Sequence, residues 1–289
     1  MPVASQVPCR LSVILARRAP IGVVFRRASG NWVQLLNWRT GRDTFDEGQW
    51  FRCKVDANRS DLSPSGDKLV YFAASYRSRS ADRGYGETWT AVSRPPYFTA
   101  LALWPLGDTW FGGGLFDDDT CLRLNHPAWK AQCHPNHPAT GLHVTTDEMY
   151  FWDRSPLSER MTRDGWMLRT KVKTIVGGRK IAGTYPQQWE KPDLKARRSL
   201  FLHDLNDGLI HHRPFHYSVV YGKTASEIVA FEAEWADWDQ AGKLAYASRG
   251  KLFRVTFTPR GRSAETREIA DFSVARPDPQ PAPEWATHW

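Results

Sequence analysis

Three short stretches of the sequence resemble one another, and this self-similarity restricts the possible folds more than any other feature. Each stretch has a four-residue turn that ends in glycine, then one or two polar residues, then an apolar or aromatic run. The turns lie at 63–66, 104–107 and 239–242, and a fainter copy lies at 162–165. Serine, proline and glycine at the first, second and fourth positions, as at 63–66, are typical of a type I turn. The pattern predicts repeated units of a turn followed by a strand.

The spacing of the glycines that end these turns indicates the size of one unit. Gly66 and Gly107 are 41 positions apart, Gly107 and Gly165 are 58 apart, and Gly165 and Gly242 are 77 apart, close to two units. A unit of about 40 to 45 residues is the span of one four-stranded propeller blade. We therefore expect an all-β fold, a single β-propeller of about five or six four-stranded blades.

The first copy also resembles the repeat of a known family. The Ser-Pro-x-Gly-x-Lys-Leu-Val-Tyr-Phe stretch at 63–72 is similar to the repeat of TolB-type β-propellers, whose blades carry such a turn before an inner strand. The other copies depart from it, since Trp104 and Asp239 stand where the first copy has serine. The resemblance implies a propeller and a bacterial origin, but no activity, because propellers have many unrelated functions.

The composition agrees with one large β domain. The 289 residues include 14 Trp, 14 Phe and 9 Tyr, which favour strands, and 21 Gly and 19 Pro, which supply turns. We assign 1–275 to the propeller and the proline-rich segment 276–289 to an extended tail. No apolar run approaches the ~20 residues that cross a bilayer, and the first residues do not match a secretory signal. We expect a cytoplasmic protein without a membrane span, and the four scattered cysteines predict no disulfide framework.

Several local patterns predict hairpins. Short turn sequences separate paired strand-like runs at 168–176 and 179–184, at 200–205 and 209–212, and at 244–247 and 252–257. The acidic residues Asp117 to Asp119 are expected in a further turn. The segment 224–235 is ambiguous, because it begins with a possible capping box for a helix and fits a strand equally well.

The most unusual local segment holds cysteines and histidines among prolines. Cys133, His134 and His137 are candidate zinc ligands, because thiolate and imidazole are the donors that zinc prefers. Their spacing matches no known finger or ribbon, and prolines beside His126, His134 and His137 predict a long projecting loop. An ordered loop without metal is the reading that we favour, so no cofactor is expected, with zinc as the alternative. A second group, around His203 and His211, is read as ordinary strand histidines.

Basic residues raise the question of nucleic acid. The formal net charge is +8, and arginines cluster at several places, including Arg77, Arg79 and Arg83 in a polar loop. The clusters are spread along the chain and no recognised nucleic-acid module is present. We therefore expect a basic, solvated surface, and not a nucleic-acid site.

Carboxylates and glycines give weaker signals for chemistry. Acidic residues from different blades meet at the axis in propeller glycosidases, but Asp164 and Asp239 have a simpler role in capping turns. The run Gly112 to Gly114 lacks the residues of a phosphate loop and is read as a bulge or a close approach between blades.

These observations favour a non-catalytic, intracellular interaction platform that binds a protein or peptide partner. The binding candidates lie in the projecting loops and are Arg77, Arg79, Arg83, His126, His134 and His137. The alternatives are a propeller hydrolase of the glycosidase or lactonase type, with carboxylates at a central funnel, and a basic nucleic-acid-binding module. The sequence does not indicate an oligomeric state.

Overall fold

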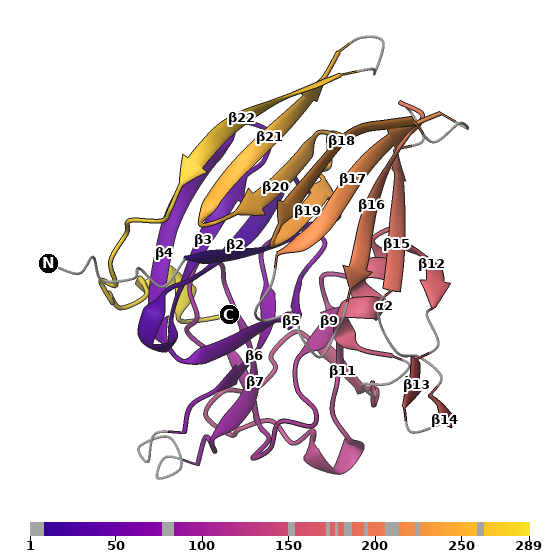
Figure 1. Cartoon of the computed structure of the whole chain (residues 1–289). Helices are drawn as coiled ribbons and strands as arrows, with labels where there is room; N and C mark the ends of the chain where they lie inside the picture. Colours follow the sequence, from indigo (N-terminus) through magenta and orange to yellow (C-terminus); the bar gives the residue numbers. More distant parts are fainter. Residues whose placement is uncertain are drawn as a thin grey trace, which may run out of the picture.

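A computed structural model describes residues 9–76, 84–149, 154–171, 174–176, 179–181, 187–193, 196–205, 214–222, 226–258 and 263–289. The described residues form antiparallel sheets, one parallel strand pair and a single α-helix. The all-β prediction is thereby confirmed. None of the sheets closes on itself (Figure 1).

Five sheets of three to five strands follow one another along the chain. The first contains β1 (Arg10–Leu15), β2 (Ile21–Arg27), β3 (Trp32–Arg39) and β4 (Thr44–Arg52), and the second contains β5 (Lys54–Leu62), β6 (Leu69–Ala74), β7 (Thr88–Ser93) and β8 (Ala102–Pro105). The third contains β9 (Gly114–Phe116), β10 (Cys121–Leu124) and β11 (His143–Thr146), and β10 and β11 run parallel. In the first two sheets, consecutive strands are neighbours, as short connections allow.

The last two sheets form the second half of the chain. The fourth has the order β12 (Met167–Lys171), β15 (Gln187–Asp193), β16 (Arg198–Leu205), β17 (Phe215–Tyr221) and β18 (Ser226–Ala233). The fifth contains β19 (Trp235–Trp238), β20 (Leu244–Ser248), β21 (Lys251–Phe257) and β22 (Ala264–Asp271). A separate two-stranded ribbon pairs β13 (Thr174–Val176) with β14 (Arg179–Ile181).

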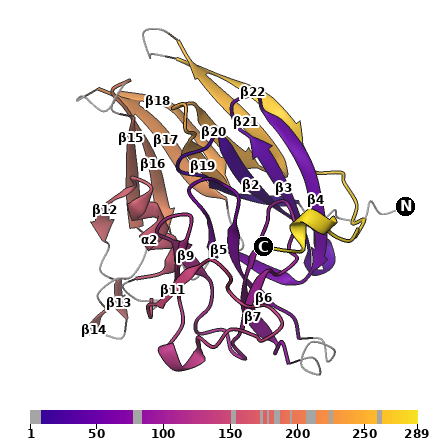
Figure 2. The ribbon, with the colours of Figure 1, turned by 180° about the vertical axis from the view of Figure 1, so that it is seen from behind.

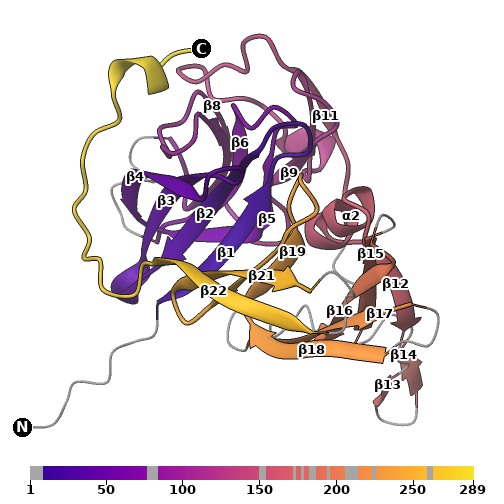
Figure 3. The same cartoon turned by 90° about the horizontal axis from the view of Figure 1, so that it is seen from above.

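Neighbouring sheets bury their apolar faces against each other. One core joins the first and second sheets, a second joins the second and third, a third joins the first and fifth, and a fourth joins the fourth and fifth. The helix α2 (Pro156–Arg163) contacts β5, β9 and β12, and so connects the second and third sheets with the fourth. The order of contacts among the sheets is therefore circular, and β1 contacts both β5 and β19 (Figures 2 and 3).

Two of the four predicted turns are confirmed in equivalent places. The Gly66 N–H donates to the Ser63 carbonyl at 2.9 Å, and the Gly242 N–H donates to the Asp239 carbonyl at 2.8 Å. Each turn joins the first strand of a sheet to its second, β5 to β6 and β19 to β20. The Asp239 carboxylate accepts the N–H groups of Ala241 and Lys243, both at 2.9 Å, which is the capping role expected for it.

The other two copies are not repeats. Pro105 ends β8, and the Gly107 N–H donates back to the Thr88 carbonyl at 3.5 Å without forming the expected turn. At 162–165 the expected turn forms, with the Gly165 N–H donating to the Thr162 carbonyl at 3.2 Å, and β12 follows it. This turn ends α2, however, and does not join the first two strands of a sheet, because short turn patterns do not distinguish a turn between strands from the end of a helix.

The helix itself was not predicted, although its start has a clear signal. The Ser155 hydroxyl accepts the Ser158 N–H at 3.1 Å, and the Ser158 hydroxyl accepts the Ser155 N–H at 2.9 Å. Proline occupies the first helical position at Pro156. This capping box with serine in place of glutamate is a weaker sequence pattern than the usual one.

The remaining local predictions have mixed outcomes. The hairpin of β20 and β21 and the turn at Asp117 to Asp119, between β9 and β10, are confirmed. The ambiguous segment 224–235 holds strand β18. Strand β16 pairs with β17, and residues 206–213, which include the whole of the predicted partner strand 209–212, lie outside the described residues.

The glycine run is the close approach that the sequence suggested. A Cβ atom on Gly112 would lie 2.2 Å from the Phe72 ring, and one on Gly113 would lie 1.8 Å from the Arg59 carbonyl oxygen. Gly113 also has a φ of +79°, where other residues are strained.

The C-terminal tail packs on the body of the protein. Ala286 is fully buried, Trp285 packs edge-on against Tyr97, and the Trp289 indole N–H donates to the Pro138 carbonyl at 3.0 Å. Gln49 reaches the Gln280 carbonyl at 3.5 Å. Most of the tail is extended, as expected, but Glu284–Ala286 form a 3-10 turn. The tail runs from the first sheet to the loops beside the third (Figure 3).

Candidate ligand-binding cavity

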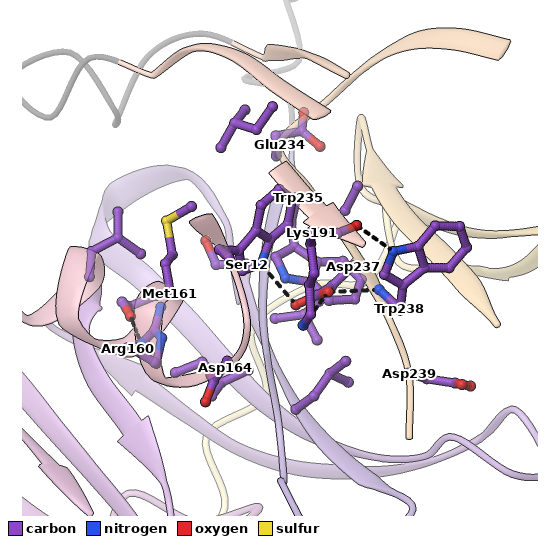
Figure 4. A pocket seen from close by; sticks show the side chains of 18 of the residues that line it. Ser12, Arg160, Met161, Asp164, Lys191, Glu234, Trp235, Asp237, Trp238 and Asp239 are labelled. Carbon is purple, nitrogen blue, oxygen red and sulfur yellow. Dashed lines mark hydrogen bonds and ion pairs between the residues drawn. The ribbon is translucent and has the colours of Figure 1, made fainter. Parts of the chain in front are cut away.

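A cavity of about 770 Å³ opens between the first strands of the sheets. Its walls come from β1, β5, α2 and β19, together with parts of β15, β16 and β17. A volume of this size is typical of sites for small molecules. Figure 4 shows several of the side chains that line it.

Turns that connect first to second strands align these walls. The Arg18 N–H donates to the Pro64 carbonyl at 2.9 Å, and the Gln240 amide donates to the Ala16 carbonyl at 2.6 Å. The Ser65 N–H donates to the Asp119 carboxylate at 2.8 Å. The turns of the first, second, third and fifth sheets therefore meet at one end of the cavity. The C-terminal ends of β1, β5, β9 and β19, which lead into these turns, lie together there.

An ion pair lies in the cavity wall between the fourth and fifth sheets. The Lys191 ammonium lies 2.7 Å from one oxygen of Asp237, which also accepts the Trp238 N–H at 2.7 Å. The Trp166 indole N–H approaches the other oxygen at 3.4 Å. Burial raises the pKa of the Asp237 carboxyl, and the Lys191 charge acts against that rise.

Aromatic side chains supply much of the apolar lining. Trp166 and Trp238 are buried on either side of the ion pair, Trp235 is half-buried on β19, and Phe215 and Tyr217 come from β17. The Trp238 indole N–H donates to the Lys191 carbonyl at 3.2 Å. Its ring is therefore held in place as part of the wall (Figure 4).

Arginines crowd the end of the cavity where the turns meet. Arg163 donates to both oxygens of Asp61, at 2.6 and 2.9 Å, and to Asp164 at 2.9 Å. Arg160 is buried and donates to the carbonyls of Ala57, at 3.0 Å, and Ser60. Because α2 carries both arginines, the helix fixes two cations at this end.

The opposite end of the cavity holds an acid, Glu234, that forms no ion pair among the described residues. The Glu234 carboxylate accepts the Arg249 backbone N–H at 3.0 and 3.1 Å, and burial raises its pKa. Arg27 nearby donates to the Val55 carbonyl at 2.6 Å, and burial lowers the pKa of this guanidinium.

Most acids of the cavity are paired with a base. Six acidic residues line it, and five of them form ion pairs among the described residues, Asp56 with Arg59, Asp164 with Arg163, Asp193 with Arg198, Asp237 with Lys191 and Asp239 with Arg254. Six basic residues line it as well. The lining is therefore balanced in formal charge.

The spread of arginines along the sequence had suggested that they lie on the surface, but some of them are buried. Arg26 is 1% exposed and Arg254 is 5% exposed. Arg26 donates to the Phe272 carbonyl at 2.6 Å and lies over the Trp50 ring. Part of the basic excess is therefore used to join sheets, because a guanidinium can satisfy several buried carbonyls and an aromatic face together.

In the predicted His-Pro loop, His126 has a structural role, and the binding role of His134 and His137 stays a prediction. His126 is fully buried, and its ring nitrogens contact the Thr90 hydroxyl at 2.8 Å and the Lys130 carbonyl at 3.1 Å. It is therefore not the projecting surface residue that we predicted, because the prolines around it lead the chain back into the core of the second and third sheets.

His134 and His137 do come together. Their ring centroids lie 5.6 Å apart, and both rings pack against Tyr85. The His137 ring nitrogens already contact Tyr85 and the Ala100 carbonyl, and the Cys133 thiol donates to the His137 carbonyl at 3.0 Å. In the described part of the chain no group of three or more potential ligands is placed to hold a metal ion. Zinc at Cys133, His134 and His137 stays a prediction, which metal analysis of the protein beside a His134→Ala/His137→Ala variant tests.

The other predicted loop cannot be placed. Arg77, Arg79 and Arg83 lie outside the described residues, as do His211 and His212. His203 contacts the Gln188 amide at 3.0 Å and the Ser218 hydroxyl at 2.8 Å, in agreement with an ordinary strand histidine.

The cavity residues were missed by sequence reasoning. Asp237 was noted only as one of several acids, and nothing in the sequence connects it with Lys191, 46 positions earlier. Their pairing depends on how the fourth sheet packs on the fifth. The one available signal was the concentration of tryptophan at Trp235 and Trp238, beside that acid.

Comparisons with known proteins add little to this picture. No family model and no curated protein matches the chain. One solved structure, an uncharacterized protein from Listeria monocytogenes EGD-e, is similar over 94% of this chain and 86% of that one, with 10% sequence identity and a TM-score of 0.31. A TM-score this low does not establish a shared fold. No helix in the described residues has the length and apolar character of a membrane crossing.

Proposed function

We propose that this chain is a five-bladed β-propeller that binds a small molecule or the end of a peptide in its central cavity, without catalysis. The circular order of contacts among the five sheets supports the propeller arrangement, with α2 filling the place between the third and fourth sheets. The alignment of the four first strands is that expected of inner blade strands.

The cavity carries the binding proposal. Its volume is that of a site for a small molecule, and aromatic side chains form much of its walls. The Asp237–Lys191 ion pair supplies polar groups in fixed positions among them. Preformed ion pairs of this kind keep the walls rigid before a ligand arrives, so less ordering is required on binding.

Catalysis is less well supported by the same geometry. A hydrolase of the glycosidase type needs two carboxyl groups, one acting as acid and the other as base or nucleophile. Of the acids that line the cavity, Glu234 is the one without an ion pair among the described residues, and Asp237 is held by Lys191. The Asp237 carboxylate already contacts the Lys191 ammonium, so the described lining supplies one carboxyl group without a basic partner where this mechanism needs two.

The compartment that we propose is the cytoplasm. The four cysteines, two buried and two half-buried, form no disulfide with one another, which is the state that a reducing compartment maintains.

Blocking the cavity tests the proposal. Ser12 is an exposed residue of β1 that lines the cavity, so Ser12→Trp fills space without replacing a core side chain. The protein is incubated with a cell extract of metabolites and peptides and then examined by native mass spectrometry. We expect the unaltered protein and the control Thr256→Trp, at an exposed site on β21, to retain a bound molecule that Ser12→Trp does not retain. Equal retention by Ser12→Trp, or none by the unaltered protein, would contradict the proposal.

A further inference from the structure

One guanidinium at the end of the cavity where the turns meet forms no ion pair among the described residues. Arg17 lines the cavity, and its Nη2 donates to the carbonyls of Phe116 and Asp117, at 2.7 and 2.9 Å. Its Nε is buried and has no hydrogen-bond partner in the part of the chain that the structure describes. Buried polar groups in native proteins almost always have a partner, and an exception calls for an explanation.

The carboxylates near Arg17 are already engaged. Asp61 binds Arg163 through both oxygens, and the same arginine binds Asp164. Asp117 pairs with Arg123 at 3.4 Å. Burial lowers the pKa of Arg17, and the Arg163 charge lowers it further, while Asp61, Asp164 and Asp117 act against this decrease. The cation of Arg17 is thus partly desolvated beside a second cation.

The neighbouring residues give this end of the cavity an excess of positive charge. The cations at this end are Arg17, Arg160 and Arg163, and the anions that pair here are Asp61 and Asp164. Asp117 forms its ion pair with Arg123. The hydrogen bonds of Arg160 go to carbonyls, which carry no charge. An anion in the cavity beside Arg17 would offset this excess of positive charge.

We propose that Arg17 is an anion subsite of the cavity, which takes the carboxylate or phosphate group of a ligand whose apolar body lies against the tryptophans. This inference rests on the proposed function and names the ligand class: an anionic group on an apolar or aromatic body, such as the C-terminus of a peptide. A guanidinium suits both groups, because its donors lie in one plane and can bind two oxygens together.

A set of matched probes tests the subsite. N-acetylphenylalanine and its amide differ only in the carboxylate, and phenyl phosphate supplies the phosphate alternative. Each is titrated into the protein and followed by tryptophan emission, since Trp166, Trp235 and Trp238 line the cavity. The variants are Arg17→Gln and, as control, Arg18→Gln, which removes the adjacent exposed arginine and its pair with Asp119. Thermal unfolding of each variant confirms that it is folded.

We expect the acid or the phosphate to bind at least about tenfold more tightly than the amide, which corresponds to ~1.4 kcal/mol. Arg17→Gln should remove that difference and Arg18→Gln should keep it. The stronger of the two anions identifies the group that the subsite selects. Equal binding of the acid and the amide, with phenyl phosphate no tighter, would overturn the subsite and leave the cavity as a binding site. No saturable response to any probe would also overturn it, while the proposed function is judged separately by the Ser12→Trp experiment. If Arg17→Gln does not fold, Arg17→Met, which also removes the charge, takes its place with the same expected loss.

Discussion

Replacing Arg254 by methionine should destabilise the protein far more than replacing an exposed arginine. Arg254 lies on β21 and joins the fifth sheet to the first. Its guanidinium lies 2.7 Å from Asp43, 2.8 Å from Asp239 and 2.8 Å from the Thr40 carbonyl, and it stacks 4.8 Å from the centre of the Trp38 ring. The side chains of Arg254 and Asp239 are 6% and 1% exposed.

The magnitude follows from the charge that is left behind. Methionine fills most of the volume, so the packing loss is small, but Asp239 becomes a buried carboxylate without its cation. Breaking a buried ion pair on one side costs about 3 to 5 kcal/mol. With an unfolding entropy of ~2.1 cal/mol/K per residue, a chain of 289 residues should lose about 5 to 8 °C in Tm.

The assay is calorimetric or fluorescence-detected thermal unfolding of a matched set. Arg267→Met is the control, because Arg267 also approaches Asp43, at 3.7 Å, but is 73% exposed. It should cost no more than about 1 kcal/mol. Adding Asp239→Asn to Arg254→Met should recover part of the loss, since asparagine keeps the oxygen that caps the turn. The reasoning is refuted if Arg254→Met and Arg267→Met have the same Tm, or if the double variant is less stable than Arg254→Met.

Three further outcomes are expected. Gly113→Ala should prevent folding, because its Cβ would lie 1.8 Å from the Arg59 carbonyl, whereas Gly107→Ala, with open space around it, should cost only about 1 kcal/mol; yields of soluble protein and urea unfolding distinguish them. Burial raises the pKa of Asp237 above its unfolded value of 3.8, so its contribution to stability is complete below that value and is lost as the pH rises through the raised pKa. Asp237→Asn should therefore lose less stability than the unaltered protein as the pH rises above about 4, and parallel curves would contradict this. Removing 276–289 should lower stability by about 2 kcal/mol, because Ala286 and the Trp289 contact are lost, and an unchanged Tm would show that the tail contributes nothing.

Local chemistry was sufficient for several elements. The turns at 63–66 and 239–242 were predictable, because proline, glycine and a capping side chain act within four residues. The β20–β21 hairpin and the close approach at Gly113 followed in the same way from short patterns.

Predictions that depended on distant contacts failed or were not available. The segment at 104–107 has the turn residues, but Thr88 on a neighbouring strand binds the Gly107 N–H and the expected strand does not follow. His126 was predicted on a projecting loop, yet Thr90 and Lys130 hold it in the interior. In each case a partner from elsewhere in the chain outweighed the local preference.

The amino-acid sequence by itself determined the all-β class and the main turns, because strand formation and turn geometry are set by neighbouring residues. Tertiary structure alone decided the cavity. Asp237 meets Lys191, and Arg17 meets Arg163, only after the sheets pack in their circular order. The energy of burying a charge depends on which groups from other sheets surround it, and that arrangement has no local signal in the sequence.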